Sequence, residues 1–473
     1  MPYLVAGAET VYGTFNKFRE DTECVQHKII KEFLEKTDSG YLFSFGNGLS
    51  NSGRGKKVKI KGYYAKSFSK FFKKDTFLKN NEVFNIEKIV MDSGGYQAQS
   101  GYLSIPECYE FTDEYVEFVK SNKDNFSYFF ALDLIPNGLT SAELLKMNDE
   151  SFSKLAELDE DIRKKVIFIY HFFTPKVYEI WKTITKKYFD KFSNYYAFGG
   201  LAAKDTTSVS LPISVFAIGI VQLVYNAKIR GMNKLSIHIL GAASYRDIML
   251  YQLYKVIIKE YHNVDLDITY DSSLVFKQIH KSRCINILEE DYTNNLISLK
   301  EANLGKMIYR VIDGVGSHIS AEDLIREKYT MMLNSINPEY AYVGKTLNIY
   351  EDKADGTGRG LGKTFGLLSI LFAGWQYNQL EYRSYAYIQE QLRLHKDDTF
   401  TFYDLMSDIL LKLNAGKLSY KFKGKLKYVR KTVECLINLD PNEIDRIVNT
   451  HLAGSEIVDL VDTDDMDLSD IGL

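Results

Sequence analysis

Short apolar runs that end in a polar residue or a glycine recur along the first two thirds of the chain, and a helix-like stretch follows each one. Their polar ends are 28 to 42 residues apart, the length of a strand, a crossover helix and two loops. A similar run, YLFSFG, precedes them at residues 41–46. The pattern predicts an alternating α/β fold around a parallel sheet. The six runs are KIVMDSGG, SYFFALD, KVIFIYH, YYAFGG, LSIHILG and DLDITYD.

Either CINIL at 284–288 or KMIYRVI at 306–312 provides an eighth strand, and eight such units predict a (β/α)8 barrel of the TIM type. A doubly wound open sheet gives the same periodicity. We favour the barrel because polar residues and glycines at the strand ends converge on one mouth there. A single aspartate or glycine at a strand end is equally well explained as a turn residue or helix cap.

Beyond the barrel, apolar residues three and four apart predict helices over 321–336, 364–395, 402–413 and 441–452. We therefore expect a barrel with a basic N-terminal insertion over 1–320, a mostly helical nucleic-acid-binding appendage over 321–454, and a disordered acidic tail over 455–473. The glycine-rich segment 355–366 has Thr357 where a P-loop needs its first glycine. We interpret it as a basic loop or a connector.

The formal charge of −3 averages unlike segments. The last nineteen residues carry seven acids and no base, so the preceding residues have an excess of four positive charges. Nine lysines and arginines follow one another between Arg54 and Lys74 with no acid among them, a pattern that suits a phosphate backbone. A second basic segment alternates with apolar residues, which indicates either nucleic-acid contact or an edge strand protected by lysines. The candidate nucleic-acid contacts are Arg54, Lys56, Lys57, Lys421, Lys423 and Lys425.

Four widely spaced cysteines without a CxxC pair indicate reduced thiols rather than a disulfide framework. The first residues do not show a basic segment followed by a long apolar one, so we expect no secretory signal. No apolar run is long enough for a membrane span, and we expect an intracellular protein without a membrane partner. His280 and Cys284 lie four residues apart on a predicted helix. Structural zinc needs four ligands, and we expect no metal and no cofactor.

Five motifs together point to a known family: MDSGGYQ around Asp92, ALDLIP around Asp133, FGGLA at 198–202, HILGAAS at 238–244 and YDSS at 270–273. In order and spacing they resemble the tRNA-guanine transglycosylase superfamily over roughly residues 40 to 290. Enzymes of that family exchange a guanine-type base for a 7-deazaguanine by cutting and remaking an N-glycosidic bond. The resemblance implies a glycosyltransferase (pentosyltransferase) activity.

Three aspartates take separate roles under this resemblance. Asp271 would be the nucleophile that holds the sugar as a covalent ester, because a carboxylate is both a competent nucleophile and a tolerable leaving group. Asp92 would be the general acid and base for the departing and arriving bases. Asp133 would read the base, since one carboxylate can accept both the ring N–H and the exocyclic amine of guanine.

The same resemblance implies the rest of the base pocket. Backbone N–H groups of the FGGLA segment would approach the base carbonyl, and Tyr96 would cover one face of the base. His171 stands where the bacterial tRNA enzymes carry a side-chain amide, and it is either a base contact or a core histidine. The glycine and leucine positions expected to bind substrate are Gly199, Gly200, Leu201 and Gly241.

Two differences from the tRNA enzymes bear on whether the substrate is tRNA or DNA. The CxCxxC zinc group is missing from the sequence, and residues 300–473 show no recognisable archaeal tRNA-binding appendage. A branch of the superfamily modifies DNA, and the Lys/Tyr/Asn-rich, Pro-poor composition is compatible with a phage source. We therefore expect DNA and a free base of the 7-cyano-7-deazaguanine type as partners, in the cytoplasm of a prokaryotic cell or phage-infected host. The alternatives are a queuine/preQ-type exchange on tRNA, a barrel glycosidase, or a non-catalytic nucleic-acid-binding paralogue; the oligomeric state stays open.

Overall fold

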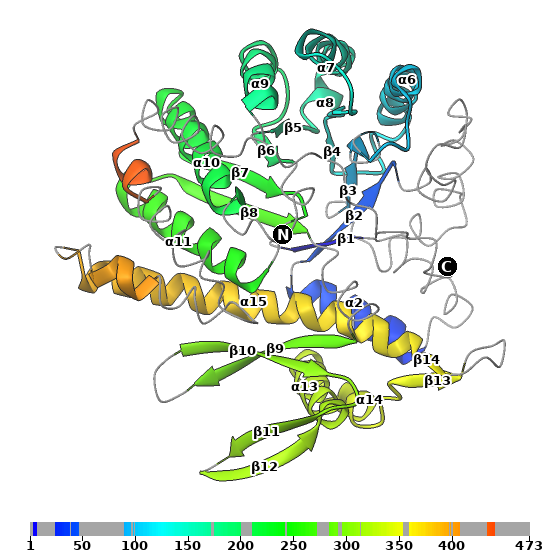
Figure 1. Ribbon diagram of the computed structural model, residues 1–473, viewed down its shortest axis with the longest axis vertical. Helices are drawn as coiled ribbons and strands as arrows, with labels where there is room; N and C mark the ends of the chain where they lie inside the picture. The colour runs from blue at the N-terminus through cyan, green and yellow to red at the C-terminus, as the bar shows by residue number, and fades with distance from the viewer. Residues whose placement is uncertain are drawn as a thin grey trace. The chain divides into compact units, whose positions relative to one another are not determined.

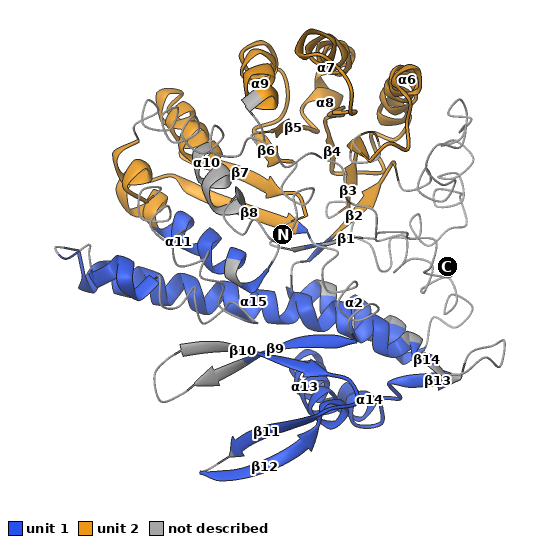
Figure 2. Cartoon of the chain, viewed as in Figure 1, with its two compact units in different colours: residues 1–40, 243–256, 271–426 blue, residues 41–242, 257–270, 427–473 orange. Residues whose placement is uncertain are grey.

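A computed structural model describes most of the strand and helix segments of the chain. The described residues are 3–6, 24–37, 39–46, 89–95, 98, 100–171, 175–199, 211–241, 244–271, 283–291, 296–312, 314–352, 359–396, 398, 401–406 and 433–439. They fall into two compact units, shown in Figure 2. The first comprises residues 1–40, 243–256 and 271–426, and the second comprises residues 41–242, 257–270 and 427–473.

A curled parallel sheet forms the centre of the second unit (Figure 1). Its seven strands are hydrogen-bonded to one another in sequence order. They correspond to YLFSFG and the six apolar runs that follow it, so these seven strand predictions are confirmed. The strands are β2 (Gly40–Ser44), β3 (Ile89–Asp92), β4 (Tyr128–Phe130), β5 (Val166–Tyr170), β6 (Tyr195–Phe198), β7 (Lys234–Ile239) and β8 (Asp265–Asp271).

Aromatic contacts across the concave face of the sheet show how strongly it curls. The rings of Tyr128 on β4 and Tyr195 on β6 lie 5.1 Å apart, and those of Phe130 on β4 and His238 on β7 lie 5.0 Å apart. Neither pair comes from neighbouring strands, so the rings meet because the sheet bends around them. The concave side is therefore a packed interior.

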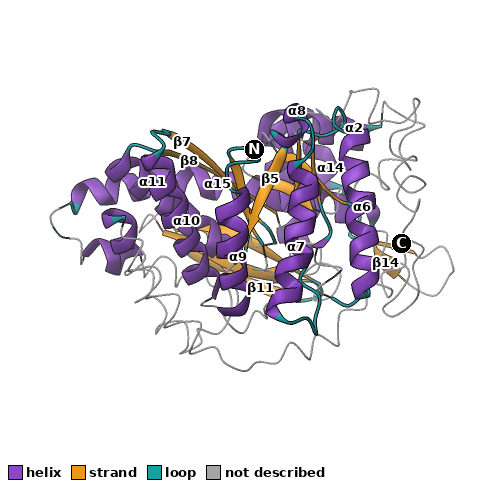
Figure 3. Ribbon diagram, turned by 90° about the horizontal axis from the view of Figure 1, so that it is seen from above, coloured by secondary structure: helices purple, strands orange, loops and turns teal. Residues whose placement is uncertain are grey.

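Helices that follow the strands cover the outside of the sheet, and Figure 3 shows α6, α7 and α9 side by side around it. Two of them begin at a capping box, Ser104 with Glu107 and Thr140 with Glu143. Apolar side chains on the inward faces of these helices bury the outer surface of the strands. The helices are α6 (Ile105–Ser121), α7 (Ser141–Ala156), α8 (Glu160–Arg163), α9 (Pro175–Tyr188), α10 (Leu211–Ile229) and α11 (Tyr245–His262).

The prediction that CINIL or KMIYRVI supplies an eighth barrel strand is wrong. These segments lie in β9 (Cys284–Asp291) and β11 (Met307–Ile312), which pair antiparallel with β10 (Leu296–Asn303) and β12 (Val315–Ser320). Period-two alternation suits a hairpin as well as a barrel strand. Cys284 accordingly begins a strand and does not lie on a helix. Within the described residues the sheet is a curled, TIM-barrel-like sheet of seven parallel strands.

The first unit combines helices with short antiparallel hairpins. The helices predicted over 321–336 and 364–395 are confirmed, the first at the same residues and the second shifted by one. Next to them lie a third hairpin and shorter elements. The elements of this unit not yet named are β1 (Tyr3–Ala6), α2 (Val25–Thr37), α13 (Ala321–Ile336), the 3-10 helix η3 (Pro338–Tyr340), α14 (Ala341–Lys345), β13 (Tyr350–Asp352), β14 (Arg359–Leu361) and α15 (Lys363–Leu394).

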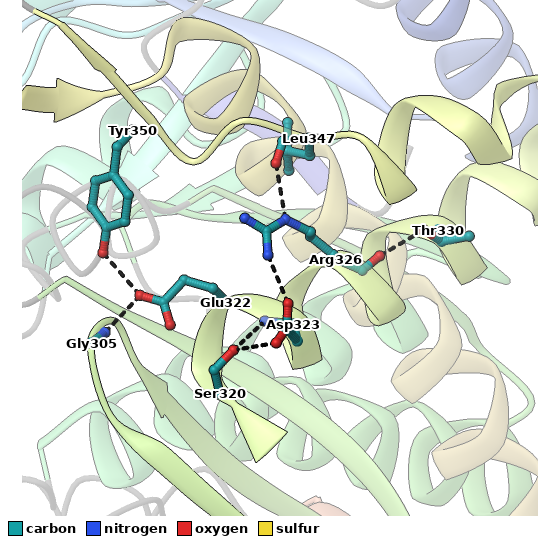
Figure 4. A network of polar contacts seen from close by, with 8 residues as sticks. All are labelled: Gly305, Ser320, Glu322, Asp323, Arg326, Thr330, Leu347 and Tyr350. Carbon is teal, nitrogen blue, oxygen red and sulfur yellow. Dashed lines mark hydrogen bonds and ion pairs between the residues drawn. The ribbon is translucent and has the colours of Figure 1, made fainter.

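Polar contacts around the first turns of α13 hold the hairpins to it (Figure 4). The carboxylate of Glu322 accepts hydrogen bonds from the backbone N–H of Gly305 and the hydroxyl of Tyr350, at 2.8 and 3.0 Å. The guanidinium of Arg326 donates to the carbonyl of Leu347 at 3.0 Å and to Asp323 at 2.8 Å. Helix α13 thus organises the strands before and after it.

Among the described helices, none combines the length and the apolar character that crossing a membrane requires.

Candidate functional site

Asp92 closes β3 and faces the concave side of the sheet. Its carboxylate accepts a hydrogen bond from the hydroxyl of Ser44, its register partner on β2, at 2.9 Å. Phe45, which follows Ser44, packs on Phe111 of α6, with ring centroids 5.3 Å apart, on the outer side of the sheet. Because side chains alternate along a strand, Ser44 and Asp92 point inward. The strand end therefore presents an oriented carboxylate to the mouth of the curled sheet.

Asp133 lies in the irregular segment after β4, and both of its carboxylate oxygens have partners. Ser93 donates its hydroxyl to Oδ1 at 3.3 Å, and Nε2 of His171 contacts Oδ2. An ionised carboxylate only accepts hydrogen bonds, so the donor opposite an ionised Asp133 is Nε2 of His171. His171 is 2% exposed and the side chain of Asp133 12% exposed. The carboxylate is thus almost enclosed, with a fixed histidine behind it.

Two glycines make this close packing feasible. A Cβ at position 95 would lie 2.9 Å from Cγ of Asp133 and closer still to the backbone oxygen of that residue. A Cβ at Gly199 would lie 2.5 Å from Cε1 and 2.8 Å from Nε2 of His171. Real Cβ contacts essentially never fall below 3.0 Å. Gly199 was expected to bind substrate; the contact seen for it is with the histidine that holds Asp133.

The ring of His171 is itself held in place. Trp181 of α9 meets it edge to face, with ring centroids 4.7 Å apart. The indole N–H of Trp181 donates to the carbonyl of Ile169 on β5 at 2.7 Å, which fixes the indole. Ser44, Ser93, Gly95 and Trp181 were not predicted as site residues. The Ser-Gly-Gly that follows Asp92 signals a tight approach, whereas nothing in the sequence marks Trp181.

Tyr115 of α6 lies within electrostatic reach of both Asp92 and Asp133. Its hydroxyl donates to the backbone carbonyl of Phe130 at 2.5 Å. Burial raises the pKa of Tyr115 well above its usual value, and the negative charges of Asp92 and Asp133 raise that pKa further. The phenol therefore stays neutral, and the two aspartates belong to one electrostatic neighbourhood.

Asp271 is the last residue of β8 and is 7% exposed. Thr269, two residues earlier, contacts Nδ1 of His238 at 2.7 Å in the sheet interior. Alternation places Asp271 on the same face of β8 as Thr269. Gly241 follows β7 and adopts a left-handed φ of 74°, which glycine tolerates and which turns the chain sharply at the strand end. Asp92 and Asp271 thus both end strands of one parallel sheet.

Several predicted site residues fall outside the described residues, so their roles stay predictions. They are Tyr96, Gly200, Leu201 and the six candidate nucleic-acid contacts Arg54, Lys56, Lys57, Lys421, Lys423 and Lys425. His280 and the acidic tail also lie there. In the part of the chain that the structure describes, no three His, Cys, Asp or Glu side chains gather as they would around a metal ion.

No family model matches the sequence, and a search of curated proteins finds no match either.

Proposed function

We propose that the chain is a transglycosylase that replaces guanine in DNA with a 7-deazaguanine of the 7-cyano type. The observation that carries the proposal is the enclosed carboxylate of Asp133, held by Ser93 and His171 beside Asp92 at the carboxyl edge of the sheet. The full (β/α)8 barrel expected from the sequence belongs to the same proposal.

Asp133 would recognise the base through the two neighbouring donors of guanine. Two carboxylate oxygens offer about four acceptor positions. Ser93 and His171 use one position on each oxygen, so one position on each remains. The ring N–H and the exocyclic amine of a guanine-type base match this pair, and adenine, which has no ring N–H there, does not. The 7-deazaguanines keep the same ring N–H and exocyclic amine, so one site serves both the leaving and the arriving base.

The exchange would proceed in two displacements. A carboxylate oxygen of Asp271 attacks C1′ of the deoxyribose while the N-glycosidic bond breaks, and Asp92 donates a proton to the departing guanine. In the second step the ring nitrogen of the 7-deazaguanine attacks C1′, the ester to Asp271 breaks, and Asp92 takes up the proton. Ser44, which donates to Asp92, would orient that carboxylate in both steps.

The choice of DNA over tRNA is supported by the sequence. The chain lacks the CxCxxC group of the tRNA enzymes. Its two basic stretches could neutralise the phosphates of either polynucleotide. The incoming base and the polynucleotide are then the two partners. No metal has a role in this mechanism, because protons and the glycosyl group move between carboxylates and bases.

The test is to incubate the protein with labelled 7-cyano-7-deazaguanine and either duplex DNA or tRNA. We expect label in DNA, with one guanine released for each base incorporated. Label in tRNA alone would overturn the choice of polymer. Release of guanine without incorporation would indicate a glycosidase, and binding without release a non-catalytic paralogue. Asp92→Asn should abolish exchange, whereas Asp113→Asn, at an exposed carboxylate on α6 that pairs with Lys154, should retain it.

A further inference from the structure

We propose that His171 is a specificity-determining positioning residue, which fixes the carboxylate of Asp133 so that both of its oxygens meet the donor pair of a guanine-type base. This inference rests on the proposed function. It assigns His171 a role through Asp133, in place of the direct base contact considered from the sequence.

The backbone around Asp133 is fixed independently of His171. Asn148 of α7, which is fully buried, accepts from the backbone N–H of Leu134 at 2.9 Å and donates to its carbonyl at 2.7 Å. Ser151 donates to the carbonyl of Leu132 at 2.8 Å. The main chain on both sides of Asp133 is thereby held to α7. These hydrogen bonds hold the backbone and leave the rotation of the Asp133 carboxylate to be fixed by side-chain contacts.

That rotation is set mainly by His171. The hydrogen bond from Ser93 is long, at 3.3 Å, whereas Nε2 of His171 makes a close contact with Oδ2. A hydrogen bond from an imidazole N–H to a carboxylate is charge-assisted, and such bonds are among the stronger ones in proteins. The ring cannot turn away, because Trp181 packs on it and Gly199 leaves no gap beside it. The imidazole therefore determines where the free acceptor positions of Asp133 point.

Discrimination between bases follows from this geometry. A correctly rotated carboxylate accepts from both the ring N–H and the exocyclic amine of guanine. Hypoxanthine keeps the ring N–H and lacks the amine, so it forms one of the two hydrogen bonds. If the carboxylate rotates, guanine loses its second hydrogen bond and the advantage over hypoxanthine shrinks. Loss of His171 should therefore alter selectivity as well as affinity.

The experiment measures exchange of labelled guanine and labelled hypoxanthine into duplex DNA by the wild type, His171→Phe and His171→Gln. Phenylalanine fills the space without a donor, and glutamine can return an N–H to Asp133. We expect His171→Phe to lower kcat/KM for guanine about 10- to 100-fold, the loss of one hydrogen bond to a charged group. The change should lie mostly in KM, with hypoxanthine affected less. His171→Gln should restore most of the guanine preference.

The matched control is His238→Phe, which replaces another fully buried histidine, one that contacts Thr269. It should leave the ratio of guanine to hypoxanthine exchange unchanged, and thermal unfolding of every variant reports whether it folds. An unchanged ratio in folded His171→Phe, with guanine exchange retained, would overturn the role of His171 and leave the proposed function standing. A wild-type protein that exchanges neither base would instead refute the proposed function, and this inference with it.

Discussion

In two regions of the molecule, glycines lie so close to neighbouring atoms that an added Cβ would clash with them. The consequences differ between the two regions. Gly95 and Gly199 lie against Asp133 and His171 at the sheet edge of the second unit, among buried groups. Gly316 of the β11–β12 hairpin, in the first unit, lies against the hydroxyl end of Tyr309, which is 57% exposed. A close approach constrains the sequence only where the neighbour cannot move away.

The difference lies in what holds each neighbour. At the sheet edge, the backbone near Asp133 is bound to Asn148 and His171 is packed against Trp181. On the hairpin, Tyr309 contacts His318 at 5.2 Å between ring centroids, and more than half of its surface is exposed to solvent. A tyrosine ring at the surface can change rotamer at little cost. The three glycines therefore predict a graded series of effects.

Gly95→Ala should have the largest effect. The atoms in its way include the backbone oxygen of Asp133, which is tied to a buried loop. We expect a loss of about 3 kcal/mol in the free energy of unfolding, the upper end for overpacking a core, and no base exchange. Urea denaturation and the labelled-base assay measure the two effects. If Gly95→Ala is as stable as the wild type, the loop that carries Asp133 can move aside for the new methyl group.

Gly199→Ala should have an intermediate effect. The new methyl group meets the imidazole of His171, which is a side chain and not backbone, so the clash is relieved by pressing that ring against Trp181. We expect a loss of about 2 kcal/mol and a raised KM for the incoming base, because displacement of His171 misaligns Asp133. A stability loss with an unchanged KM would separate the packing role of Gly199 from base recognition.

Gly316→Ala should have the smallest effect. Displacing Tyr309 costs little, and replacing a strand glycine by alanine gains roughly 0.5 to 1 kcal/mol in backbone entropy. The free energy of unfolding should therefore stay the same or rise by up to about 1 kcal/mol, with base exchange intact. A loss above 1 kcal/mol in urea denaturation would mean that Tyr309 is held as firmly as His171, and the contrast between the two regions would fail.

Strong periodic signals account for what could be predicted from the sequence. Seven strands and the helices α13 and α15 were predictable because their apolar positions repeat over whole elements. The segments taken as an eighth strand show the same alternation, yet β9 and β11 pair with their own neighbours. Periodicity reports which face of a strand is buried and does not identify its partner.

The candidate site was predictable as a set of strand ends and not as a set of contacts. Asp92, Asp133 and Asp271 could be selected because each follows an apolar run. The pairing of Asp133 with His171 depends on the irregular segment after β4 and on the packing of Trp181 against β5. Such contacts are set by tertiary packing, which has no local sequence signal, and so the role of His171 stayed open.

The most direct test of the central claim is to trap the covalent intermediate. The wild type, Asp271→Asn and Asp113→Asn are each mixed with labelled duplex DNA without an incoming base and then denatured. We predict that the wild type and Asp113→Asn retain label on the protein through an ester to the sugar, and that Asp271→Asn retains none. A denaturation-resistant adduct that persists in Asp271→Asn would contradict the account, because the nucleophile would then be another residue.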